Sequence, residues 1–191
     1  MKVYQTIISI LEKKGPLPIP AICSEVNKVL ITKRKKPLRP SQITSIVTRQ
    51  KDIFLINREG ISIHPDKNPS TLKVSIDCHT GTSYKIYVHF INNRFILFEW
   101  RNKESISPFN YERSGNYGSI EELKRELYSI RIWEWQPNYR KAGGIILDGT
   151  YWTITLNTKG KIHKSEGIDC FPPRWKLLCQ AIERLTGVSL R

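Results

Sequence analysis

Hydrophobic residues in the first third of the chain recur at helical spacing in three successive segments. The apolar positions are Val3, Ile7, Ile10 and Leu11 in the first segment, Ile19, Ile22, Val26 and Leu30 in the second, and Ile43, Ile46 and Val47 in the third. Gly15-Pro16 ends the first segment, and Ser41 stands at the N-cap position of the third. The pattern therefore predicts three amphipathic helices, the third beginning at Ser41.

A different pattern follows the third helix. Residues 53–56 (Ile-Phe-Leu-Ile) and 61–63 (Ile-Ser-Ile) are short runs of strand-forming residues. The Asn57-Arg58-Glu59-Gly60 stretch between them has the composition of a hairpin loop. Residues 32–40 (TKRKKPLRP), just before the third helix, are too basic and proline-rich to be helical. We predict three helices, a basic loop before the third, and a two-stranded ribbon.

This order of elements resembles a winged helix-turn-helix domain, in particular the HARE-HTH type found in bacterial restriction-modification systems and transcription-associated proteins. The resemblance rests on the Gly15-Pro16-Leu17 stop, on residues 36–42 (KPLRPSQ) and on residues 54–63 (FLINREGISI). It implies DNA binding through the third helix and the ribbon, called the wing. Some winged-helix domains instead serve protein–protein contacts. The proline-rich start of the second helix departs from the usual pattern.

Basic and polar side chains gather on this stretch, and we assign them two roles. Gln42, Ser45 and Arg49 would contact base edges, because amide, hydroxyl and guanidinium groups match the donors and acceptors of bases. Other cations would contact phosphates. The complete predicted DNA-binding set is Lys33, Arg34, Lys35, Lys36, Arg39, Ser41, Gln42, Ser45, Arg49 and Arg58. The alternative for the basic run is a solvated loop without a partner.

The charge balance favours a polyanionic partner. Lysine and arginine number 31 against 17 acids, a formal net charge of +14. Residues 1–70 carry 13 basic and 5 acidic side chains, a net of +8, whereas residues 71–191 carry 18 and 12, a net of +6 over a longer span. Neutralising phosphates releases condensed counterions, so this excess favours nucleic acid. We expect duplex DNA as the partner, with a homodimer or a protein partner left open.

The second half of the chain has strand-like alternation. Residues 66–70 are turn formers and are predicted as a linker between a winged helix at 1–65 and a second domain at 71–191. Strands are predicted at 72–76, 83–91, 94–100, 151–156 and 161–165, with helices after Ser119 and after Pro172-Pro173. The predicted fold class is α+β: an N-terminal winged helix followed by an antiparallel β-sheet domain with two helices.

Large aromatic rings are frequent in this second half. The tryptophans are Trp100, Trp133, Trp135, Trp152 and Trp175. Core and cross-strand packing is the plainer interpretation. The alternative is a pocket or platform that stacks a base. Because residues 131–135 alternate, they predict a strand with Trp133 and Trp135 on one face, and these two are the base-stacking candidates.

Sequence patterns of common enzymes are absent. There is no GxSxG, GxxxxGK[ST] or GxGxxG motif, and the four cysteines form no CxxC pair. Carboxylates for a metal-dependent nuclease would be Asp77, Glu99, Asp148 and Glu166, but no Asp…Glu-x-Lys signature accompanies them. We therefore predict no catalytic residue, no metal and no cofactor.

The expected function is DNA binding by the winged helix, with a non-catalytic C-terminal recognition or docking domain, in bacterial or phage defence or in regulation. The alternatives are a metal-dependent nuclease or restriction-linked enzyme, and a protein-interaction adaptor or inhibitor. Residues 148–152 and 171–175 resemble segments of bacterial proteins of unassigned activity, which implies no mechanism. The sequence has no signal-peptide core and no apolar run of roughly 18–20 residues, so we expect a cytoplasmic location.

Overall fold

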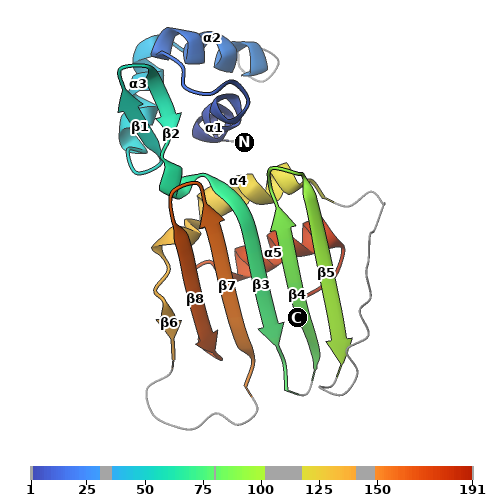
Figure 1. Cartoon of the computed structure of the whole chain (residues 1–191). Coiled ribbons are helices and arrows are strands. Elements are labelled where there is room, and N and C mark those ends of the chain that lie inside the picture. Colours follow the sequence, from blue (N-terminus) through green and yellow to red (C-terminus); the bar gives the residue numbers. More distant parts are fainter. Residues whose placement is uncertain (1, 31–35, 80, 102–117, 141–148, 191) are drawn as a thin grey trace. The chain divides into compact units, whose positions relative to one another are not determined.

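Two compact units make up the chain, Met1–Asn68 and Pro69–Arg191. The computed structural model describes residues 2–30, 36–79, 81–101, 118–140 and 149–190 (Figure 1). Helices and strands occur together, which confirms the predicted α+β class. Residues 66–70, predicted as a linker, contain the end of a short 3-10 helix, η1 (Pro65–Lys67), and the start of the first strand of the second unit.

The first unit contains three helices followed by a two-stranded antiparallel ribbon. These elements are α1 (Val3–Lys14), α2 (Ile19–Leu30), α3 (Pro40–Arg49), β1 (Phe54–Asn57) and β2 (Gly60–Ile63). The predicted apolar stripes form its core, in which Ile7, Ile22, Ile43 and Val47 are at most 1% exposed. The hairpin pairs Asn57 with Gly60, so Arg58 and Glu59 form its tip.

A residue outside the predicted strands completes this ribbon. Leu17, just after α1, donates its N–H to the Ile61 carbonyl at 3.1 Å and accepts the Ile61 N–H at 2.8 Å. Gly60 permits this approach: its φ is +129°, and a Cβ there would lie 2.5 Å from the Leu17 carbonyl carbon. The ribbon is thereby attached to the end of α1, and another residue type at position 60 would force the two backbones apart.

The described residues of the second unit form a six-stranded sheet and two α-helices. The strands are β3 (Pro69–Asp77), β4 (Thr82–His89), β5 (Arg94–Arg101), β6 (Asn138–Tyr139), β7 (Tyr151–Thr158) and β8 (Ile162–Ile168), in the order β5-β4-β3-β7-β8-β6. Five strands are antiparallel as predicted. The two-residue β6 pairs parallel to β8, so the sheet is mixed.

Helices α4 (Ile120–Ile130) and α5 (Trp175–Thr186) lie behind the sheet in Figure 1, on one of its faces. Alternate residues of the strands are buried beneath them, including Val74, Ile86 and Leu97. The ring centroids of Trp152 and Trp175 are 4.7 Å apart, which places α5 against β7. The sheet thus has one face buried by these helices and one face that no helix in the described ranges covers.

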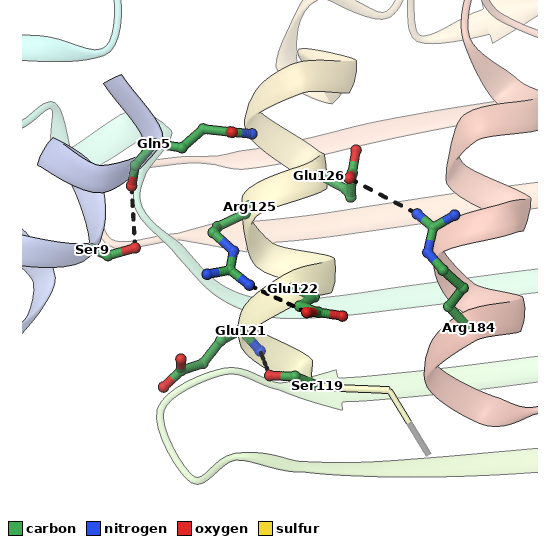
Figure 2. Close-up of polar contacts among 8 residues, drawn as sticks. All are labelled: Gln5, Ser9, Ser119, Glu121, Glu122, Arg125, Glu126 and Arg184. Atoms are coloured by element: carbon green, nitrogen blue, oxygen red, sulfur yellow. Dashed lines mark hydrogen bonds and ion pairs between the residues drawn. The ribbon is translucent and has the colours of Figure 1, made fainter. Parts of the chain in front are cut away.

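An ion pair at the surface joins α4 to α5 in this unit (Figure 2). Arg184 of α5 lies 3.9 Å from the Glu126 carboxylate of α4. Ser119, predicted to cap α4, accepts the Glu121 N–H at 3.1 Å. Exposed ion pairs contribute at most about 1 kcal/mol, so apolar packing between the helices and the sheet carries most of the stability.

Two local predictions are wrong. Helix α3 begins at Pro40 with Arg39 as its N-cap, not at Ser41. Pro40 has no N–H to leave unsatisfied in the first turn, and the Gln42 Oε1 accepts the Arg39 N–H at 2.9 Å. These two features extend the helix by one residue beyond the predicted start.

The second error concerns residues 131–135, predicted as a strand. Arg131 ends α4 in the left-handed conformation with φ 58°, and a 3-10 helix, η2 (Ile132–Glu134), follows. Ile132, Trp133 and Trp135 are all buried. Residue types alternate there but burial does not, so the strand pattern is coincidental.

Candidate nucleic-acid interface

The outward face of α3 is the surface that the sequence singles out. Ser41, Gln42, Ser45 and Arg49 are all exposed, and they lie within about 100° of the helix circumference at 3.6 residues per turn. Ile43 and Val47, on the opposite side, are buried at 0% and 1% exposure. The buried stripe fixes the rotation of the helix, so the polar face is held toward solvent.

Several of these polar side chains also bond to the local backbone. The Ser45 hydroxyl donates to the Ser41 carbonyl at 3.0 Å, and the Thr44 hydroxyl donates to the Pro40 carbonyl at 3.1 Å. Gln42 uses its carbonyl oxygen at the N-cap, which leaves its NH₂ group to face solvent. Each group therefore keeps a fixed orientation while retaining a donor or acceptor for a ligand.

Exposed cations flank this face at both ends. Lys36, Arg39 and Arg49 are exposed along the approach to α3 and at its end, and Arg58 is exposed at the hairpin tip. In the part of the chain that the structure describes, no ion pair neutralises these four side chains. The predicted contacts Lys33, Arg34 and Lys35 lie outside the described residues.

A half-buried amide that the sequence analysis did not identify anchors the segment before α3. Asn27 of α2 donates from Nδ2 to the Leu38 carbonyl at 2.9 Å and accepts the Leu38 N–H at 2.7 Å. The Cys23 thiol donates to the same carbonyl at 3.2 Å. Because Leu38 directly precedes Arg39, these bonds hold the start of α3 against α2. The sequence signal that could have identified this anchor is the polar Asn27 near the end of the predicted second helix.

Ion pairs join the first two helices. Lys14 of α1 lies 2.6 Å from the Glu25 carboxylate, and Lys28 of α2 lies 2.9 Å from it. These lysines, Lys14 foremost, lower the pKa of Glu25 below its ordinary value. The two helices are thereby joined on their surface as well as in the core.

In the second unit two groups have a raised pKa. Burial, and after it the hydrogen bond to Glu166, raises the pKa of the Tyr151 phenol. Burial raises the pKa of the Cys179 thiol to about 11. A thiol with this pKa is a poor nucleophile at neutral pH, so Cys179 is not a candidate catalytic residue.

Trp133 and Trp135, the predicted base-stacking pair, do not form a surface platform. They are 8% and 9% exposed. Trp133 packs edge-on against Tyr128 at 5.5 Å between ring centroids, and Trp135 packs against Trp175 at 6.2 Å. Their rings belong to the core beneath the helices, so neither offers a free face to a base.

The nuclease alternative gains no site among the described residues. Asp77 and Glu166 belong to β3 and β8 and Glu99 to β5, whereas Asp148 lies outside the described residues. No group of three or more His, Cys, Asp or Glu side chains in the described part of the chain is placed to hold a metal ion.

No protein-family model, curated protein or solved structure was found to match the chain. None of the helices in the described ranges has the length and apolar character needed to cross a membrane.

Proposed function

We propose that this protein binds duplex DNA through its N-terminal unit, which acts as a winged helix-turn-helix domain. Helix α3 enters the major groove, and the β1–β2 ribbon is the wing that follows the neighbouring backbone. The observation that carries the proposal is the sided character of α3, in which Ile43 and Val47 are buried while Gln42, Ser45 and Arg49 face solvent. An α-helix fits the major groove, where each base pair presents a distinct set of donors and acceptors.

The arrangement of cations supports this orientation. Lys36 and Arg39 lie at the N-terminal end of α3, and Arg58 lies at the tip of the hairpin. Phosphates on either side of a groove occupied by α3 would be within reach of these two groups of cations. Contacts of this kind position a protein on DNA, while the α3 side chains distinguish bases.

The second unit acts in this proposal as a non-catalytic recognition or docking domain. The resemblance of the first unit to HARE-HTH domains supports a role in bacterial or phage defence or in transcription regulation. Among the described residues no group of three or more His, Cys, Asp or Glu side chains is placed to hold a metal ion, so the nuclease alternative gains no support there.

The test is the salt dependence of duplex binding by the full chain, measured by fluorescence anisotropy between about 50 and 200 mM salt. Each phosphate contact contributes about −0.9 to the slope of log affinity against log salt. The double variant Arg39→Ala/Arg58→Ala should therefore reduce the steepness by about two. Lys176→Ala, which removes an exposed cation of α5, is the matched control and should leave the slope unchanged.

Two results would contradict the proposal. One is no duplex binding by the unsubstituted chain at the lowest salt. The other is an identical slope for the double variant and the control, because the cations beside α3 would then make no contact with phosphate.

A further inference from the structure

The face of the sheet opposite α4 and α5 carries aromatic and basic side chains where a solvated sheet is ordinarily polar. We define the open patch as Lys73 of β3, Lys85 and Tyr87 of β4, and Ile96 and Phe98 of β5. Figure 1 shows these three strands side by side at one end of the sheet, with both helices on the other side.

The strand register brings these side chains together. Lys73 pairs with Tyr87, and Tyr87 pairs with Ile96, which forms one row across the three strands. In the next row Lys85 pairs with Phe98. Directly opposed side chains have Cβ atoms about 4.5–5.5 Å apart, and diagonal neighbours such as Tyr87 and Phe98 about 7–8 Å. Two rings and two ammonium groups therefore share one small surface.

The exposure of these residues sets them apart from core residues. Tyr87 is 38% exposed and Ile96 44%, and both lysines are exposed. Phe98 is half-buried. On β5 the outward residues are Arg94 and then the large apolar Ile96, Phe98 and Trp100, whereas Phe95 and Leu97 point to the covered face.

Charge indicates the kind of partner. Lys73, Lys85 and Arg94 point to this side of the sheet, and none of them has an ion pair in the described part of the chain. The described carboxylates on the same face, Asp77 and Glu166, lie outside the open patch. Asp77 accepts a hydrogen bond from Ser75 at 3.2 Å, and Glu166 accepts one from Tyr151 at 3.1 Å. The open patch is therefore cationic as well as aromatic.

We propose that the open patch binds single-stranded DNA, with Tyr87 and Phe98 stacking on bases and Lys73 and Lys85 contacting phosphates. Arg94, on β5 beside the patch, contacts a further phosphate. A flat surface of rings contacts the faces of bases, which are available in a single strand and hidden in a duplex. The choice of DNA over RNA rests on the proposed function of the first unit. The stacking surface itself is argued from the second unit alone.

The experiment compares variants of the full chain for binding to a fluorescent oligothymidine of about 16 nucleotides. The double variant Tyr87→Ala/Phe98→Ala should weaken binding by roughly 5- to 150-fold per stacked base. Tyr87→Phe keeps the ring and should bind like the unsubstituted chain. Lys85→Ala should reduce the salt slope by about 0.7, whereas Lys176→Ala on α5 should not. Thermal melting of each variant shows whether the fold is intact.

A second arm separates this site from the N-terminal unit. In the Arg39→Ala/Arg58→Ala background, binding of the single strand should persist while duplex binding falls. If duplex binding did not fall in this background while the single strand still bound, the proposed function would be overturned and the stacking surface would stand.

Three outcomes would overturn the inference. Unchanged affinity for the single strand in folded Tyr87→Ala/Phe98→Ala would show that the rings do not stack on bases. Tighter binding of the matching RNA through the same residues would replace DNA as the partner. A dimer in light scattering that Tyr87→Ala converts to a monomer would assign the patch to a second copy of the chain.

Discussion

The outward face of α3 and the open patch are both positively charged, but the first lies on a helix and the second on a β-sheet. The outward face of α3 has short polar side chains such as Ser45 on a narrow cylinder, which suits contact with base edges in a groove. The open patch has rings such as Tyr87 on a broad sheet, which suits contact with base faces. The comparison teaches that positive charge favours a polyanionic partner, whereas the shape beneath the charge separates the two proposals, a duplex for α3 and a single strand for the open patch.

The largest expected effect comes from destabilising the core of one unit while leaving the other unit folded. Ile43→Ala removes a side chain with 0% exposure from the core of the first unit and should cost about 2–5 kcal/mol of folding free energy. Calorimetry should show a lower Tm for the first unit, together with loss of duplex binding and retention of single-strand binding.

Leu97→Ala, in the core of the second unit, is the reciprocal control for that experiment, since Leu97 is 1% exposed. It should weaken single-strand binding and spare duplex binding. Loss of both activities in each variant would mean that the two surfaces do not act separately.

A smaller effect should come from the α3 face itself. Arg49→Ala should cost about 1–3 kcal/mol of binding free energy on a selected duplex site, because a guanidinium bonded to a base is lost. Its exposure means that the Tm should not change. Anisotropy with the duplex and with oligothymidine measures both affinities. Equal losses on the two ligands would argue that Arg49 contributes only general charge.

The anchor beneath α3 is expected to have an effect of similar or smaller size. Asn27→Ala removes both Asn27 hydrogen bonds to Leu38. The buried Leu38 N–H then lacks a partner, while the Leu38 carbonyl keeps the Cys23 thiol. This should destabilise the first unit by about 1–3 kcal/mol. Asn27→Asp keeps the acceptor for the Leu38 N–H and should lose less. Chemical denaturation measures both values, and an unchanged free energy of unfolding for Asn27→Ala would contradict the assigned role.

The smallest effect concerns pH. Because Lys14 and Lys28 lower the folded-state pKa of Glu25 below its ordinary value of 4.5, the carboxylate contributes stability above that pH and loses it as the pH falls further. Glu25→Gln should therefore reduce the drop in Tm of the first unit between about pH 5 and 3. A drop of the same size in the variant would show that Glu25 makes no net contribution. The second unit, without this residue, serves as the internal reference.

Much of the fold follows from local pattern. The three helices and the ribbon of the first unit were predicted because the helical period, Gly15-Pro16 and the Asn57–Gly60 loop act over a few residues. The same holds for the hairpin strands and for α5, which Gly187 ends in the left-handed conformation with φ 72°. The outward face of α3 was also predictable, since an apolar stripe defines the polar side opposite to it.

Other features depended on contacts between distant residues. Three of them join segments far apart in the sequence, and the local pattern of one segment does not predict its partner. They are the bridge from Leu17 to Ile61, the hydrogen bonds from Asn27 to Leu38 and the parallel pairing of β6 with β8. The tight turn after α4 likewise replaced a predicted strand, because Trp133 and Trp135 fill the core beneath the helices instead of lining a sheet face.

The sequence by itself determined that neighbouring residues of β4 and β5 point to opposite sides of a sheet. Only the tertiary structure decided which side is covered. Residues 95–98 of β5 are apolar without interruption, so alternation could not assign Ile96 and Phe98 to either face. Helices α4 and α5 pack where Ile86 and Leu97 point, because those residues share a row with other core positions. Because the helices pack on that face, Tyr87 and Phe98 on the opposite face point toward solvent.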